Sequence, residues 1–243
     1  CSQLSLKPMM GKYRIAIVED ADYLNEESAN AFLKTLEEPG PGSVLILIGS
    51  SPDHQLDTVV SRCQVVQFQP LSPDDIEAIL LDSHLASQKA EARKLAEQSE
   101  GSLARALALA DQDYQSARQL ILHELIHSGV PTAPRIAKIM EDHVKNSGKE
   151  AALQRRRAVL ILEDLSRFFR DVLWNGAGLS SPSGDVTWSE SVRRLATSCE
   201  PEDVFILADR SMLAIGQIQS NGNMGLILSA WASDVCQTLQ RAK

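Results

Sequence analysis

The segment YRIAIVEDADYLNEESANAFLKTLEEPGPGSVLILIGSSPDHQLDTVVSRCQVVQF, residues 13–68, decides the fold. It contains three short apolar runs, at 13–18, 44–48 and 63–68. Between the first two runs, apolar residues recur at helical spacing over 25–36. Short apolar runs that alternate with helices are typical of parallel strands buried on both faces. In such sheets the functional residues lie just past the carboxyl ends of the strands. We therefore expect Glu19, Asp20 and Ser50 at the functional edge of a parallel sheet.

Composition and charge narrow the class of protein. The chain has 243 residues, a formal net charge of −8, 44% hydrophobic and 5% aromatic residues, which suits a soluble globular protein with an aliphatic core. No apolar run approaches the roughly 20 residues that a membrane helix needs, and no signal peptide is visible. The four cysteines are widely scattered, which argues against a disulfide scaffold and predicts a cytoplasmic protein. The acidic balance argues against a chain that grips DNA by itself.

After residue 70 the sequence predicts helices throughout. Ser72 can cap a first helix whose apolar face is Ile76, Ile79 and Leu80, and Pro73 suits its first turn. Proline, glycine and asparagine separate the later helical stretches, which we expect near 87–98, 103–110, 113–128, 132–146, 149–174, 188–198, 201–220 and 224–241. The last two stretches carry broad apolar faces, and an apolar face left exposed would suit a partner.

The strings SANAFLKTLEEP at 28–39 and TVVSRC at 58–63 resemble the AAA+ core of bacterial DNA polymerase III clamp-loader subunits, most of all those of the delta-prime type. The resemblance covers roughly residues 6–111 and is mostly a helix pattern beyond. It implies a mainly α fold with an α/β part. The implied domains are a truncated AAA+ parallel-sheet core, a three-helix lid and an all-α collar, at 1–70, 71–112 and 113–243. Because no Gly-x-x-x-x-Gly-Lys-Ser/Thr loop is present, we expect a fragment that lacks the P-loop portion of the family.

The resemblance also implies a function. Arg62 of the serine-arginine-cysteine string would act as an arginine finger in trans, at an ATP and Mg²⁺ site held by a neighbouring subunit. The alternative is a surface arginine or a structural ion pair. Partners would be gamma/tau-like and delta-like subunits, with the sliding clamp and primed DNA engaged through the assembly. The chain itself would bind no cofactor.

Three departures from the family pattern favour a subunit that does not hydrolyse ATP, so catalysis by this chain is uncertain. Glu19 and Asp20 stand in the reverse of the Walker B order, which misplaces both carboxylates by about a methylene. Ser50 is near the position of the first sensor, where serine can bond phosphate or simply start a turn. In the lid string Gly-Ser-Leu-Ala-Arg, alanine replaces the second-sensor arginine, and Arg105 is turned about 100° around the helix.

Other functions stay open. A motor-type ATPase subunit is the alternative within the family, and a helical scaffold without AAA+ partners is another. His123-Glu124-Leu125-Ile126-His127 matches a zinc-hydrolase string, with a possible third ligand at Glu141, Asp142 or His143. The five arginines at 155–157, 167 and 170 could contact DNA phosphates, although such a run is more often a solvated helix face. We interpret the tryptophans as packing or interface anchors.

Overall fold

The computed structural model describes residues 13–19, 21, 24, 26–40, 42–49, 52–126 and 132–241. The chain forms two compact units, Cys1–Gln69 and Pro70–Lys243, and each is considered by itself. No helix within the described ranges is long and apolar enough to cross a membrane. The expected finer division of the second unit, into 71–112 and 113–243, stays a prediction.

In the first unit, β1 (Arg14–Val18) and β2 (Ser43–Leu47) form a parallel pair in which Arg14 lies opposite Ser43 and Val18 opposite Leu47. Helix α1 (Glu26–Glu37) connects them, as the helical spacing predicted. A short 3₁₀ turn, η2 (Pro52–His54), and helix α2 (Asp57–Val60) follow β2. The parallel pairing expected for the first two apolar runs is therefore confirmed.

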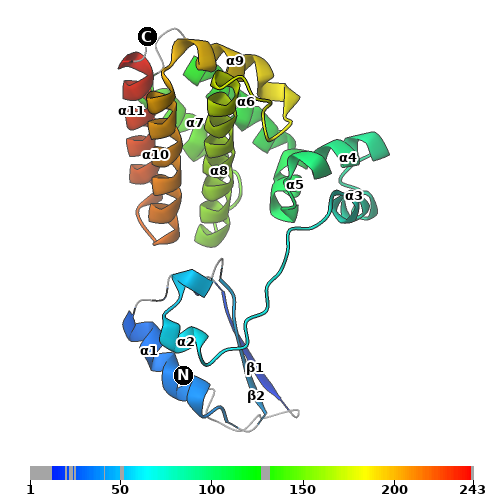
Figure 1. Cartoon of the computed structure of the whole chain (residues 1–243), viewed down its shortest axis with the longest axis vertical. Helices are drawn as coiled ribbons and strands as arrows, with labels where there is room; N and C mark the ends of the chain where they lie inside the picture. Colours follow the sequence, from blue (N-terminus) through cyan, green and yellow to red (C-terminus); the bar gives the residue numbers. More distant parts are fainter. Residues whose placement is uncertain are drawn as a thin grey trace. The chain divides into compact units, whose positions relative to one another are not determined.

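The expectation that these strands are buried on both faces is wrong for the described chain. Residues alternate along both strands between half-buried and exposed, and Ile15 and Ile17 are 62% and 58% exposed. Figure 1 shows α1 and α2 on one side of the strand pair. Because no described element covers the other side, every second side chain of each strand meets solvent.

The third apolar run, Cys63–Phe68, was expected to be a strand, and this too is wrong. The run is extended but pairs with no described strand, and Val66 and Phe68 are 66% and 92% exposed. A groove of about 480 Å³ is lined by this run together with Leu47 and Val59. Strand structure requires a hydrogen-bonded neighbour, and the described chain brings none beside this run.

The second unit begins with three short helices, α3 (Pro73–Asp82), α4 (Lys89–Gln98) and α5 (Leu103–Ala110). The predicted cap is confirmed, since the Ser72 hydroxyl accepts a 3.2 Å hydrogen bond from the Asp75 amide. The Ser102 hydroxyl caps α5 in the same way. Each cap satisfies an amide that would otherwise have no partner at the helix start.

Longer helices follow and make the fold mainly α. They are α6 (Gln112–Ile126), α7 (Ala133–Lys145), α8 (Ala151–Gly176), α9 (Ser189–Ser198), α10 (Pro201–Gln219) and α11 (Met224–Arg241), with a 3₁₀ turn, η3 (Val186–Trp188), before α9. These bounds agree closely with the sequence prediction, because proline and glycine mark most of the breaks.

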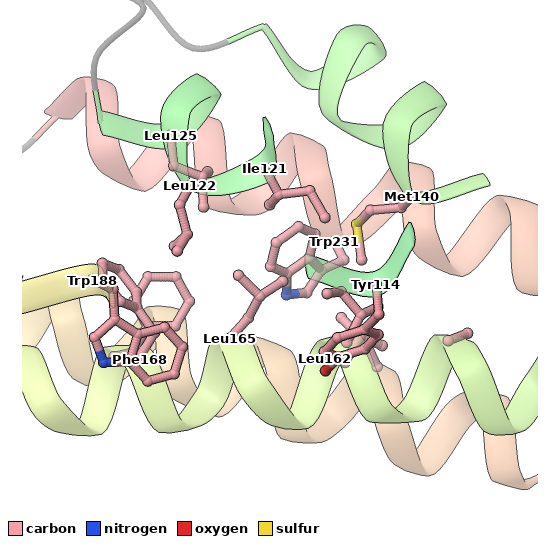
Figure 2. Close-up of a cluster of buried hydrophobic side chains, with 14 of the residues drawn as sticks. Tyr114, Ile121, Leu122, Leu125, Met140, Leu162, Leu165, Phe168, Trp188 and Trp231 are labelled. Atoms are coloured by element: carbon pink, nitrogen blue, oxygen red, sulfur yellow. The ribbon is translucent and has the colours of Figure 1, made fainter. Parts of the chain in front are cut away.

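Helix α8 lies at the centre of this bundle and packs along α10. Figure 2 shows side chains of α6, α7, α8 and α11 meeting in one cluster, which includes Ile121, Met140, Leu165 and Trp231. All four are at most 2% exposed, and the Trp231 indole N–H donates to the Ser211 hydroxyl at 3.0 Å. The core is largely aliphatic, as the composition predicted.

Candidate functional site

Arg62 lies just past the end of α2, where the helix ends at Val60. Its Nε donates a 2.8 Å hydrogen bond to Glu37 Oε1, and its Nη2 lies 2.6 Å from the same oxygen. Its Nη1 donates to the Thr58 carbonyl at 2.9 Å and to the Ser61 hydroxyl at 3.3 Å. Two segments that the sequence singled out, the ends of the 28–39 and 58–63 strings, therefore meet at this guanidinium.

The contact between Arg62 and Glu37 lies at the surface. The two side chains are 35% and 51% exposed. An ion pair in such a position contributes about 0–1 kcal/mol, because water screens both charges. A guanidinium held this weakly can exchange a carboxylate for phosphate oxygens, which it also binds as a planar fork.

The predicted functional edge of the sheet is described only in part. Glu19 follows β1 directly and is exposed. Asp20 and Ser50 lie outside the described residues, as does His127. Beside Glu19, the Ile48 amide donates to the Val18 carbonyl at 2.9 Å, and the Ala21 amide donates to the Ile48 carbonyl at 2.8 Å. The carboxyl ends of both strands therefore lie at one edge, as expected for a parallel pair.

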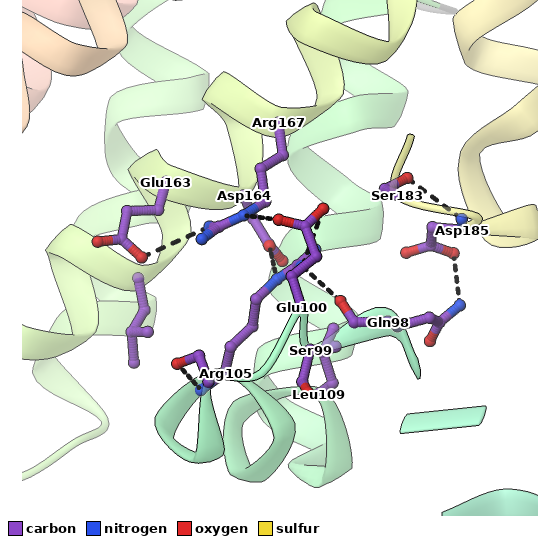
Figure 3. Close-up of polar contacts among 12 residues, drawn as sticks. Gln98, Ser99, Glu100, Arg105, Leu109, Glu163, Asp164, Arg167, Ser183 and Asp185 are labelled. Carbon is purple, nitrogen blue, oxygen red and sulfur yellow. Dashed lines mark hydrogen bonds and ion pairs between the residues drawn. The ribbon is translucent and has the colours of Figure 1, made fainter. Parts of the chain in front are cut away.

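Sequence reasoning missed a buried charge network in the second unit, which Figure 3 shows in part. It joins α4, α5, α6, α8 and the cap of η3, and each member is at most 6% exposed. Its members are Gln98, Arg105, Tyr114, Arg118, Asp164 and Asp185. Of these residues, only Arg105 stands out in the sequence, as the arginine that follows alanine in the string Gly-Ser-Leu-Ala-Arg.

Asp164, on α8, is the centre of the buried charge network. Its Oδ1 accepts from Arg105 Nε at 2.8 Å, and its Oδ2 accepts from the Tyr114 hydroxyl at 2.9 Å and lies 3.2 Å from Arg118 Nε. Burial raises the pKa of the Tyr114 hydroxyl well above its usual value, and the negative charge of Asp164 raises it further. The phenol therefore stays protonated and donates to the carboxylate.

Asp185 forms the second centre. One carboxylate oxygen accepts from the Gln98 amide at 3.1 Å, and the other pairs with Arg118 Nη2. Burial alone would raise the pKa of Asp185, but the Arg118 charge and the hydrogen bonds from Thr187 outweigh it and lower the pKa. The Arg118 guanidinium also lies 4.0 Å from the Trp188 ring centre, a favourable cation–π arrangement.

The zinc-hydrolase string has no support among the described residues. Glu124 is buried and lies 3.1 Å from Arg135 Nη2, so the proposed base is already paired. The candidate third ligand His143 accepts from Arg157 Nε at 3.0 Å, and burial followed by the Arg157 charge lowers its pKa to about 4. Across the described ranges no group of three histidine, cysteine or carboxylate side chains could hold a metal ion.

The arginine run of α8 serves mostly as internal structure. Arg155 donates to the carbonyls of Ile218 and Gly222 at 3.0 and 3.2 Å. Arg157 bonds His143 and also Asp111, at 2.8 Å. Further along the helix, Arg167 and Arg170 both pair with Glu100. These contacts engage four of the five arginines in bonds within the protein, whereas Arg156 is exposed.

An exposed apolar surface lies on α10. We call it the α10 stripe; its members are Phe205, Ile206, Met212 and Leu213, which are 64%, 44%, 58% and 48% exposed. Residues seven and eight apart lie on the same side of a helix, so these side chains share one face.

Of the three tryptophans, Trp188 and Trp231 are buried and Trp174 is 44% exposed.

Residues 1–72 match the sequence family described as "DNA polymerase III, delta subunit". DNA polymerase III subunit delta' of Bacillus subtilis (strain 168) is 35% identical over 117 residues, which are 47% of this chain and 35% of that protein. DNA polymerase III subunit tau of Escherichia coli (strain K12) is 34% identical over 109 residues, 43% of this chain and 17% of that protein. Subunit tau of B. subtilis is 23% identical over 251 residues, covering 97% of this chain and 45% of that protein.

A solved structure, described as Bacillus subtilis DNA clamp loader delta protein, is similar over 99% of this chain and 81% of that chain, with 13% sequence identity and a TM-score of 0.35. The chain spans less than half of the length of each of the three curated relatives above. The family match over residues 1–72 includes the strings at 28–39 and 58–63. Parts of this chain are therefore similar to subunits delta' and tau of DNA polymerase III.

Proposed function

We propose that this protein is a stator-like clamp-loader subunit, which holds ATP-hydrolysing neighbours and presents Arg62 to ATP bound by one of them. The observation that carries the proposal is the position of Arg62, a partly exposed guanidinium whose Nε and Nη2 contact the exposed carboxylate of Glu37. Its Nη1 bonds the Thr58 carbonyl and the Ser61 hydroxyl. In this proposal, the γ-phosphate oxygens of the neighbour's ATP replace Glu37 as the partner of Nε and Nη2. The arginine then stabilises the negative charge that develops on the transferred phosphoryl group.

The proposal assigns no ATP hydrolysis to this chain. Its ATP and Mg²⁺ belong to the neighbour's site, where Arg62 would supply charge from outside. The burial of Arg105 supports this assignment, because a guanidinium that is 1% exposed and bonded to Asp164 is not available to a nucleotide. The reversed order of Glu19 and Asp20 supports it as well.

Assembly is proposed to use the α10 stripe. Large apolar side chains that are exposed on one helix face in the single chain suit a protein interface, here with the exposed Asp209 between the two pairs. Gamma/tau-like and delta-like subunits would be the neighbours, and the cytoplasm the site of action. Through that assembly the protein would take part in loading the sliding clamp on primed DNA.

Assembly can be tested by size-exclusion chromatography of this protein mixed with tau and delta subunits from the same source. We expect co-elution of the wild type, and at least about tenfold weaker association for Phe205→Ser, because it removes a large apolar contact. Leu120→Ser is the matched control, since Leu120 is 54% exposed on α6, outside the stripe. Failure of the wild type to join would contradict the clamp-loader proposal, and equal binding of both variants would contradict the stripe.

A motor-type subunit is the second candidate, and the match to the B. subtilis tau subunit over 97% of this chain favours it. That candidate predicts ATP hydrolysis by the protein alone in its full-length form, with the P-loop portion expected from the family. The stator proposal predicts hydrolysis only when a tau subunit is present. Measuring phosphate release by the full-length protein with and without tau separates the two.

A further inference from the structure

The three helices α3–α5 are too small to be an independent folding unit. They span residues 73–110, below the roughly 40 residues at which small domains usually need outside support. Their apolar side chains, such as Ile76, Leu80 and Leu109, belong to one continuous core with α6–α11. Whether they move separately from the bundle therefore depends on what joins the two.

The buried charge network joins α3–α5 to α6–α11, and we call this connection the joint. Two of its links cross from α4 and α5 to the bundle, since Gln98 bonds Asp185 and Arg105 bonds Asp164. Arg105 Nη1 also donates to the Gln98 carbonyl. Both carboxylates are themselves fixed from the far side by Arg118 of α6. Opening the joint would break both crossing bonds and separate the apolar side chains around them, which form one continuous core, so it is unfavourable.

The turn between α4 and α5 strengthens the same joint. Glu100 and Gly101 both have positive φ angles, 51° and 83°, and Glu100 reaches Arg167 and Arg170 of α8. The Gly101 carbonyl accepts a 3.0 Å hydrogen bond from the Leu71 amide. One short turn therefore connects the start of α3, the end of α4 and the middle of α8.

We propose that the buried charge network fixes α3–α5 to α6–α11, so that residues 73–110 move with the bundle as one rigid body and do not open or close as a separate lid. Arg105 and Gln98 act as positioning residues in this device. A subunit built in this way would transmit a displacement of its bundle to α3–α5 without loss. The inference concerns this chain alone and does not depend on the proposed role of Arg62.

The test is hydrogen exchange of this protein, followed by mass spectrometry. In the wild type, amides of α4 and α5 should be protected to within about tenfold of those in α8, because opening one requires opening the other. A separately moving lid would instead exchange more than about a hundredfold faster than α8, and this result would overturn the proposal. The wild-type comparison requires no substitution, so it decides even if a variant fails to fold.

Arg105→Met is the informative variant, because it keeps most of the side-chain volume and leaves Asp164 with Arg118 and Tyr114. We expect exchange in α3–α5 to rise by about tenfold or more, with little change in α10 and α11. Arg93→Met is the matched control, since Arg93 is 42% exposed and pairs only within the three helices. Unchanged exchange in Arg105→Met, or equal effects of both variants, would contradict the proposal.

Discussion

Replacing Asp164 by alanine should be among the most damaging substitutions in the protein. Asp164 is 1% exposed and is the common partner of Arg105, Arg118 and Tyr114. The two arginines are 1% and 2% exposed, so water cannot replace the lost carboxylate without opening the core. The substitution therefore leaves positive charge buried with incomplete neutralisation.

The magnitude follows from that arrangement. Removing one partner of a buried ion pair costs about 3–5 kcal/mol, mostly because the other charge stays buried. Arg118 retains Asp185, and Arg105 retains the Gln98 carbonyl, so a value near the lower end is expected. With a urea dependence of about 2 kcal/mol per molar, the unfolding midpoint should fall by roughly 1.5–2 M.

Tryptophan fluorescence is a suitable assay, because all three tryptophans, Trp174, Trp188 and Trp231, lie in the second unit. Their signal reports unfolding of residues 70–243 and is insensitive to the first unit. A second variant, Asp164→Ala combined with Arg105→Met, should recover about 1–3 kcal/mol, since one stranded charge is then absent.

Asp234→Ala is the control. Asp234 is 46% exposed on α11 and lies 3.6 Å from Arg210, so its loss should cost less than about 1 kcal/mol. If Asp164→Ala lowered the free energy of unfolding by no more than this control, the carboxylate would not be the centre of the buried charge network. A double variant no more stable than Asp164→Ala would refute the assignment of the penalty to Arg105.

Two further stability predictions concern single positions. Gly101→Ala should lower the free energy of unfolding in urea by about 2–4 kcal/mol, because the added Cβ would lie 2.5 Å from the Cβ of Pro70 and the φ angle is +83°. Gly178→Ala is the control, since its φ is +74° and no atom lies within 4 Å of the added Cβ, so it should lower that free energy by only about 1–2 kcal/mol. Equal losses of stability in the two variants would contradict the clash with Pro70. His143 has its pKa lowered to about 4, so the unfolded state binds the extra proton between pH 6.5 and 4, and stability should fall by up to roughly 3 kcal/mol as pH drops through that range. His143→Gln should remove this part of the pH dependence, and an unchanged pH profile would show that the histidine is not buried as a neutral base beside Arg157.

The helices were predictable because their signals are local. Ser72 caps a helix where the sequence placed it, and proline and glycine mark most helix ends. The failed strand at 63–68 has a non-local cause. Its apolar pattern is correct for a strand, but pairing depends on a neighbour that the described chain does not provide.

The same distinction applies to the candidate site. Arg62 was found from a contiguous string, and the structure adds its partner Glu37, which is 25 residues away in sequence. Asp164 and Asp185 gave no signal, because an acidic residue within a helix or a loop is more often exposed. Their partners lie 59 and 67 residues away in sequence, and only the packed structure brings them together.

The most direct test of the proposed function is the rate of ATP hydrolysis by tau and delta subunits with this protein, the sliding clamp and primed DNA. Arg62→Ala should assemble like the wild type but stimulate turnover roughly tenfold less or worse, because an arginine that contacts the transferred phosphate contributes strongly to the rate. Glu37→Ala is the matched control for loss of the surface pair and should still stimulate. If Arg62→Ala assembled and stimulated as well as the wild type, Arg62 would be a structural residue and the proposed role in trans would be contradicted.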